Sequence, residues 1–346
     1  NVLTSPLGVS NALSLVLAGA TPSSTCENEI KEVLKVSSHT ELPRLGMLLS
    51  STAEEGGVQL TTANSVWTNN IKPEYISLVR EKHASEALAL PKDYSAVDDW
   101  LKEKTHGLIS NVLSGPIDSN VVALLMNVVH FKGSWANKFD ESRTEDGTFK
   151  SSDGPLKARM MHAHRKMDVA RLPGKATALR LDYGSNGSAG EFCAVFVLPH
   201  QSTAASMQEA INGIALNQMS KTLSLFSPKD VLLQLPRFKV EWGAKSLKPY
   251  LRKLGINSAF DGRGIFSGMS DDPEVYLDDV IQKVVMEVTE EGTVAASSTM
   301  AMMKSRSLPP PPLEISFDRP FLMMVMHSPT ATPVFIGKFD KPELMF

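Results

Sequence analysis

The feature that most constrains this chain is a strand-like run that passes directly into a long stretch of small residues. Val284, Met286 and Val288 alternate with the side chains of the opposite face, which predicts a strand. Beyond Gly292, residues 293–299 are small and uncharged on both faces. Such a run forms no stable element by itself, but its backbone can slide between two strands of an existing sheet.

The same segment ends at an arginine and a proline rod. Arg306-Ser307-Leu308 precedes four prolines at 309–312, which lack backbone donors and favour an extended polyproline II conformation. Trypsin-like proteases cleave after an arginine on an exposed loop, because their specificity pocket carries an aspartate. From composition alone, residues 290–308 are a flexible surface loop with a trypsin site, a feature that many proteins share.

Composition excludes several classes of function. Of the 346 residues, 42% are hydrophobic, which is enough for a large core, and the net charge of −3 gives no reason to expect a nucleic-acid partner. The longest apolar run, residues 121–131, is interrupted by Asn127 and His130, so we expect no membrane span. Cys26 and Cys193 are too few for a disulfide framework or a structural zinc site, and whether they pair is open.

Helical patterns dominate the first third of the chain, and strand patterns dominate the rest. The predicted helices lie at residues 10–20, around 30–34 and at 95–104, and the predicted strands lie at 121–129, 192–199, 230–240 and in a C-terminal hairpin from 321 to 336. Residues 245–255 predict a short helix that ends at Gly255, with four inward residues: Leu247, Tyr250, Leu251 and Leu254. Because helices and strands are intermixed without a repeat or a long linker, we expect one large mixed α+β domain.

The sequence offers no constellation for catalysis or cofactor binding. Gly-X-Ser-X-Gly, His-Glu-X-X-His and Walker A motifs are all absent. His162 and His164 share one face of a predicted strand, as metal ligands do, but no third ligand is nearby, so we expect surface histidines. We therefore predict a protein that is not an enzyme, with no catalytic residues, no cofactor and no metal.

Residues 290–299, Glu-Glu-Gly-Thr-Val-Ala-Ala-Ser-Ser-Thr, are very similar to the hinge of the serpin family. Further matches to family elements follow in order along almost the whole chain: Asn1 with Ser5-Pro6-Leu7-Gly8-Val9-Ser10, Asn64-Ser65-Val66-Trp67, Asn127 with Phe131-Lys132-Gly133-Ser134-Trp135, Leu235-Pro236-Arg237-Phe238-Lys239, Phe266-Ser267-Gly268-Met269 and Asp318-Arg319-Pro320-Phe321-Leu322. The resemblance implies the serpin fold, with three β-sheets, about eight or nine helices and an exposed reactive-centre loop at 290–308. Residues 1–346 would form a single domain without the family's N-terminal helix, and we expect a monomer.

The resemblance also implies an inhibitory mechanism. In inhibitory serpins the residue before the cleaved bond is the seventeenth from the first hinge glutamate, and counting from Glu290 this is Arg306. A trypsin-like serine protease would attack the Arg306 carbonyl of the bond Arg306–Ser307 with its own serine. Insertion of residues 292–305 into the central sheet would then trap the covalent acyl-enzyme. The hinge residues are Glu290, Glu291, Gly292, Thr293, Ala295, Ala296, Ser297, Ser298 and Thr299.

Two alternatives stay open at this point. A shift of the reactive bond to Lys304 is one, whereas a bond after Met302 or Met303 conflicts with the count. The other is a non-inhibitory serpin, a carrier or chaperone whose loop is cut as a substrate. Such members tend to have bulky, charged or proline residues where this chain has small ones, which favours inhibition. These small hinge residues are Thr293, Ala295, Ser297 and Thr299.

Four residues match the family's shutter, where the central sheet opens, and its breach, where the loop enters. They are Ser5, Asn127 and Gln282, with Trp67 at the breach. Gln282 stands where many members have a histidine bonded to the asparagine that Asn127 matches. Glutamine can still donate and accept a hydrogen bond, so the contact can survive, but the usual control of sheet opening is not assured. Gly8 replaces the family's second serine.

We expect no glycosaminoglycan cofactor. The stretch that carries basic residues in heparin-activated members, residues 37–60, has Arg44 as its only base. A weaker candidate is a basic face on the helix predicted at 245–255, for which a solvated helix surface is the alternative. Its residues are Lys245, Lys248, Arg252 and Lys253.

The compartment has one weak indicator in the sequence. Asn186-Gly187-Ser188 is a glycosylation sequon, and such triplets also occur by chance. We expect an extracellular protein, with a cytoplasmic location as the alternative.

Overall fold

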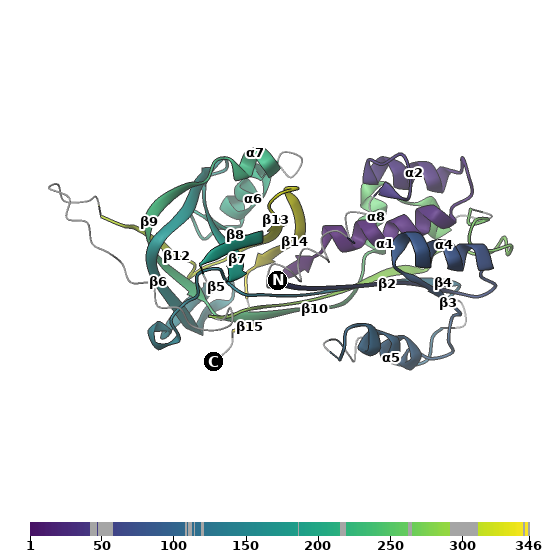
Figure 1. Cartoon of the computed structure of the whole chain (residues 1–346), viewed down its shortest axis with the longest axis horizontal. Helices are drawn as coiled ribbons and strands as arrows, with labels where there is room; N and C mark the ends of the chain where they lie inside the picture. Colours follow the sequence, from purple (N-terminus) through teal and green to yellow (C-terminus); the bar gives the residue numbers. More distant parts are fainter. Residues whose placement is uncertain are drawn as a thin grey trace.

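The computed structural model describes residues 1–41, 47, 58–107, 109, 113, 115–118, 121–185, 187–214, 219–261, 265–290, 311–341 and 343–344. Helices and strands alternate irregularly along this part of the chain (Figure 1). The helices are α1 (Pro6–Gly19), α2 (Thr25–Leu34), α4 (Pro73–His83), α5 (Ser95–Lys104), α6 (Ala204–Gly213), α7 (Met219–Leu223), α8 (Lys248–Leu254) and α9 (Ser258–Asp261), with a 3-10 helix, η1, at Glu141–Arg143. The described part therefore has the mixed α+β character that the sequence predicts.

A six-stranded sheet forms the centre of the molecule. Its strand order is β15 (Glu343–Leu344), β10 (Phe238–Ser246), β11 (Asp279–Val288), β4 (Ala123–Gly133), β2 (Val58–Thr68) and β3 (Glu86–Leu88). β4 and β11 pair in parallel from Asp279↔Leu124 to Met286↔Phe131 without a register shift. No strand lies between them, although both of their other neighbours, β2 and β10, pair antiparallel.

The remaining strands form one nine-stranded network. Its order is β1 (Val2–Thr4), β14 (Thr332–Phe339), β13 (Phe321–His327), β8 (Ser188–Pro199), β7 (Ala176–Ser185), β6 (Gly154–Leu172), β9 (Ser227–Pro236) and β12 (Leu313–Ser316), with β5 (Glu145–Ser151) also on β6. The 19 residues of β6 pair with β5 and β9 along most of their length and with β7 at their end. The expected three sheets therefore appear as two hydrogen-bonded networks, because β6 joins two of them.

The two faces of the six-stranded sheet carry different helices. α1, α2 and α4 cover one face, and α5 lies on the other (Figure 1). Alternate residues of β4 serve the two faces: Leu125 packs with α1 and α4, whereas Leu124 and Met126 pack with Trp100 of α5. At its other end the sheet meets the nine-stranded network in an aromatic core around Phe321, which is fully buried.

The predicted helix at 245–255 is shorter than expected. Lys245 belongs to β10, where it pairs with Gln282, and α8 begins at Lys248. Gly255 ends the helix as predicted, with a left-handed φ of 107°. Leu251 is buried, but Tyr250 and Leu254 are 59% and 64% exposed, so the prediction that both face inward was wrong. A helix of two turns has room for only one fully buried position here.

No helix in the described ranges reaches the length and apolarity that crossing a bilayer requires. The two cysteines do not pair: each is a free, buried thiol, Cys26 under α1 and Cys193 in β8. Burial raises the pKa of Cys26 to about 12 and raises that of Cys193 as well. Both side chains act as small apolar core residues.

We expect the folded protein to show almost no rapidly reacting thiol at pH 8, because both sulfur atoms are buried and protonated. Unfolding in guanidinium chloride without reductant should release both thiols of each chain. The measurement is a colorimetric thiol titration before and after unfolding. Absence of free thiol after unfolding would mean that Cys26 and Cys193 are joined, contrary to the structure.

Candidate functional site

A ladder of amide side chains crosses the middle of the six-stranded sheet. Asn64 of β2, Asn127 of β4 and Gln282 of β11 lie at the same level, since Asn127 pairs with both of the others in register. Gln282 Nε2 donates to Asn127 Oδ1 at 2.6 Å, and Asn127 Nδ2 donates to Asn64 Oδ1 at 2.7 Å. All three residues are buried. Because amides do not titrate near neutral pH, these bonds do not depend on pH.

The start of α1 closes the ladder from one side. Gln282 Oε1 accepts from the Ser5 backbone N–H at 3.1 Å and from Thr4 Oγ1 at 2.8 Å, while Gln282 Nε2 also donates to the Ser5 carbonyl. Ser5 Oγ caps α1 by accepting from the Gly8 N–H and donates to the carbonyl of Val334 in β14. Ser5, Asn127 and Gln282 thus form one buried network, with Gln282 in contact with both others.

Gly8 lies directly against this network. A Cβ atom at this position would be 2.5 Å from Asn127 Oδ1 and 2.8 Å from Val129 Cγ2. Such distances are far below van der Waals contact, so a side chain here would displace the Asn127 amide. A side chain at position 8 would therefore require either the Asn127 amide or the start of α1 to move.

Trp67 does not lie near Glu290, so the prediction that it marks the breach was wrong. It pairs with Leu124 at the end of β4 that is level with Asp279, eleven residues before Glu290. At ~3.3 Å per residue this separation is roughly 36 Å. Trp67 packs edge-on against Trp100 instead, with ring centroids 6.0 Å apart. The resemblance of Asn64-Ser65-Val66-Trp67 to a family strand was misleading here, because β2 runs antiparallel to β4 and its C-terminal end lies far from Glu290.

Trp135 is the tryptophan at the hinge end. Its Nε1 donates to the Thr289 carbonyl at 2.9 Å, and its ring stacks on Tyr183 at 4.5 Å, where burial raises the pKa of the Tyr183 phenol. The motif Phe131-Lys132-Gly133-Ser134-Trp135 was the signal for this position. Trp135 follows the C-terminal end of β4, which lies beside the C-terminal end of β11.

Glu290 is the only one of the predicted hinge residues among the described ones, and it is 4% exposed. Thr144 Oγ1 donates to Glu290 Oε1 at 2.7 Å, and Arg237 Nη1 lies 3.7 Å from Oε2. The Phe139 N–H donates to the Glu290 carbonyl at 3.4 Å. Side chain and backbone of Glu290 are thus both held where β11 ends.

Several predicted residues lie outside the described part of the chain. These are the reactive bond, Arg306 and Ser307; the hinge residues Glu291, Gly292, Thr293, Ala295, Ala296, Ser297, Ser298 and Thr299; and the sequon residue Asn186. Their roles stay predictions.

The four basic residues proposed as a weak cofactor face do not share one helix. Lys245 is in β10, and the other three are in α8. Lys248 donates to the Asp278 carbonyl at 3.0 Å, and Arg252 forms an ion pair with Asp261, while both cations lie over the Phe260 ring. Lys253 completes the set on the exposed side of α8. These contacts weaken the case for a common basic face.

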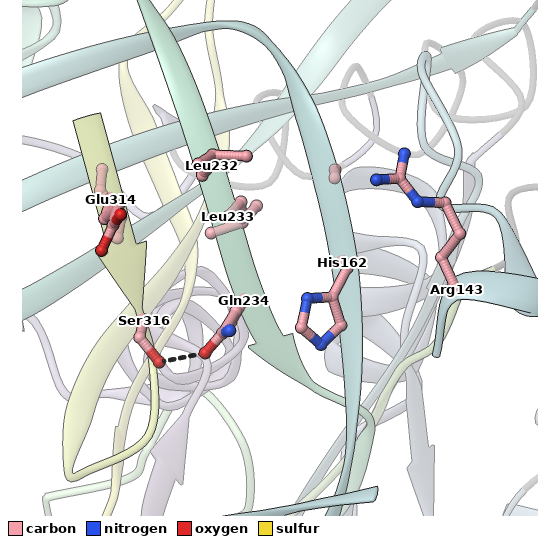
Figure 2. A pocket seen from close by; sticks show the side chains of 9 residues that line it. Arg143, His162, Leu232, Leu233, Gln234, Glu314 and Ser316 are labelled. Atoms are coloured by element: carbon pink, nitrogen blue, oxygen red, sulfur yellow. Dashed lines mark hydrogen bonds between the residues drawn. The ribbon is translucent and has the colours of Figure 1, made fainter. Parts of the chain in front are cut away.

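A cavity of about 270 Å³ lies beside β6, β9 and β12 (Figure 2). His162, Arg143 and Glu314 line it, and Ser316 Oγ donates to Gln234 Oε1 at 2.9 Å at its edge. His164 lies on β6, as His162 does, and its Nε2 is 3.3 Å from Asp230 Oδ1. Within the described ranges no group of three potential metal ligands includes either histidine.

The chain is similar to known proteins over nearly its whole length. A family model described as "Serpin (serine protease inhibitor)" matches residues 1–342. Serpin B8 of Homo sapiens is 31% identical over 99% of this chain and 93% of its own length, and Iripin-8 of Ixodes ricinus is 28% identical over 98% and 88%. Native protease nexin-1 with heparin superposes with a TM-score of 0.83 at 24% identity, covering 99% of this chain and 92% of that one. Human thyroxine-binding globulin complexed with thyroxine superposes with a TM-score of 0.82 at 24% identity, with 99% and 92% covered.

The amide ladder predicts a non-additive response to mutation. Asn127→Ala leaves the Gln282 and Asn64 amides buried without this partner, at a cost of about 1–3 kcal/mol for each group. We expect a lower denaturation midpoint for uncleaved Asn127→Ala, and a loss in Asn127→Ala/Gln282→Ala that is smaller than the sum of the single losses. Gln208→Ala, on the exposed side of α6, is the control and should leave the midpoint unchanged. Strict additivity would contradict the ladder.

Gly8→Ala tests the close approach of α1 to Asn127. Overpacking of this kind typically costs about 1–3 kcal/mol, more than alanine gains over glycine in a helix. We expect a lower denaturation midpoint for the uncleaved protein. Gly243→Ala is the matched control, because its added Cβ meets no atom within 4 Å. An unchanged or raised midpoint for Gly8→Ala would show that the helix start can move away.

Proposed function

The chain belongs to the serpin family of serine protease inhibitors, and from this premise we propose that it traps trypsin-like serine proteases through the reactive bond Arg306–Ser307. It is a protease inhibitor rather than an enzyme. In the proposal the whole chain acts as a single inhibitory domain. The target protease supplies the catalytic groups, and this chain supplies the bait and the conformational change.

The observation that carries the proposal is the parallel contact between β4 and β11. The segment from Glu290 to Arg306 follows β11 directly. A chain that turns back beside β11 runs antiparallel to it, and because β4 is parallel to β11 it also runs antiparallel to β4. The returning segment could therefore form antiparallel backbone hydrogen bonds with β4 on one side and β11 on the other. The closed sheet has only the one parallel set of hydrogen bonds between β4 and β11 at this place.

The free-energy gain from such an insertion is large. The β4–β11 contact spans eight residue pairs, and separating the strands exchanges one ladder for two. With a net ~0.5–1.5 kcal/mol per additional hydrogen bond, the added hydrogen bonds contribute roughly 4–12 kcal/mol in favour of the inserted form, and the entropy cost of ordering the segment opposes this contribution. This is comparable to the whole stability of a typical domain. The small residues of the hinge leave few side chains to accommodate, which supports inhibition over the carrier or chaperone alternative.

Arg306 determines the class of target in this proposal. The protease serine forms an ester with the Arg306 carbonyl carbon, and the bond to Ser307 breaks with the nitrogen of Ser307 taking up a proton as the new amino terminus. Insertion of residues 292–305 then carries the acyl-enzyme away before water completes hydrolysis. Relatives of this chain include a leukocyte elastase inhibitor of Xenopus laevis. The small specificity pocket of an elastase does not suit arginine, so we propose a different target class.

We also propose secretion, supported by the sequon at Asn186. Treatment of the protein from a secreting eukaryotic host with peptide N-glycosidase would reduce its apparent mass if the site carries a glycan. A glycosaminoglycan cofactor is not part of the proposal.

Mixing the purified protein with a slight excess of trypsin tests the proposed mechanism. We expect a band near the summed masses that survives SDS, and a released C-terminal fragment that begins at Ser307. Arg306→Ala should abolish this band with trypsin, whereas the neighbouring Lys304→Ala should not. Cleavage after Arg306 without a stable complex would favour the carrier or chaperone alternative, and a fragment that begins at Ser305 would move the bond to Lys304.

A further inference from the structure

Arg165 of β6 is a half-buried cation without an acidic partner. Among the described residues no carboxylate lies within ion-pair distance of its guanidinium, and burial lowers its pKa to about 10. A charge in this position is costly unless hydrogen bonds compensate it. The hydrogen bonds that Arg165 donates to backbone carbonyls must therefore offset this cost.

Those partners belong to the short segment that follows β4. Arg165 Nη2 donates to the Asn137 carbonyl at 2.7 Å, and Nη1 donates to the Lys138 carbonyl at 3.0 Å. The guanidinium also lies 5.3 Å from the centroid of the Phe139 ring, which is 5% exposed. The planar fork of arginine thus fixes three consecutive residues, which a lysine ammonium would do less well.

The same segment holds the hinge end of β11. Trp135 Nε1 donates to the Thr289 carbonyl, and the Phe139 N–H donates to the Glu290 carbonyl. On its other side, the Ala136 N–H donates to the Asp182 carbonyl of β7. Residues 134–139 therefore connect β7, β6 and the residues at which the proposed reactive loop begins.

We propose that Arg165 is a positioning residue that latches the hinge end of the closed sheet and slows loop insertion in the uncleaved protein. The guanidinium holds Asn137, Lys138 and Phe139 in place, and through them the carbonyl of Glu290. This inference rests on the proposed function, because it assigns a role in the timing of insertion. It requires no ligand and no titration.

Hydrogen–deuterium exchange on the uncleaved protein tests the latch without any protease. In Arg165→Ala we expect faster exchange in residues 134–139 and 284–290, and unchanged exchange in β8 and β13. Arg165→Lys should fall between this variant and the wild type. Arg171→Ala, at an exposed position of the same strand, is the control and should match the wild type. Unchanged exchange at 134–139, or a uniform increase across the nine-stranded network, would overturn the inference.

A second measurement addresses timing. The uncleaved proteins are incubated at 37 °C without protease, and their remaining capacity to form the trypsin complex is followed. Arg165→Ala should lose this capacity roughly tenfold faster than the wild type, which corresponds to ~1.4 kcal/mol in the barrier. An equal rate of loss would overturn the latch. If the wild type forms no complex at all, the proposed function fails, and the exchange experiment still decides whether Arg165 holds the hinge end.

Discussion

The parallel contact between β4 and β11 is the constraint on which the rest of this structure depends. Both strands have antiparallel partners on their outer sides, so the contact between them is the place where the sheet can accept another strand of opposite direction. The sheet is closed here, and the segment proposed to insert follows β11. The proposed mechanism therefore requires a barrier that keeps the strands together while a form with more hydrogen bonds is accessible to the same chain.

In the proposed mechanism, the amide ladder contributes to that barrier. Separation of β4 from β11 breaks the bond between Asn127 and Gln282 in a site from which water is excluded, and both amides lose partners at once. Gln282 also binds Thr4 and Ser5, so opening of the sheet disturbs the start of α1. The absence of a side chain at Gly8 lets α1 approach Asn127 closely. The two residues that depart from the family pattern, Gly8 and Gln282, thus both contact Asn127 in this network.

Local sequence patterns predicted much of the fold but little of its long-range geometry. The helix at 95–104 and the C-terminal hairpin are present as predicted. Residues 230–240 were expected as one strand, yet they form β9 and β10 in different sheets, because alternation continues on both sides of Arg237 and does not encode the change of partner. Likewise, Trp67 ends β2 and Trp135 follows β4, and the antiparallel pairing of these two strands places only Trp135 near Glu290.

The ladder in the middle of the closed contact and the hinge end of that contact differ in how well their polar groups are satisfied. In the ladder, the bonds from Gln282 to Asn127 and onward to Asn64 are short. At the hinge end, Thr144 donates to the Glu290 carboxylate at 2.7 Å, but Arg237 lies 3.7 Å from Glu290 and its Nε has no partner among the described residues. The bond from Phe139 to the Glu290 carbonyl is 3.4 Å long. Buried polar groups that are incompletely paired raise the free energy of the state that contains them. Separation of β4 and β11 should therefore begin at Glu290 and reach the ladder later, the order that the proposed insertion requires.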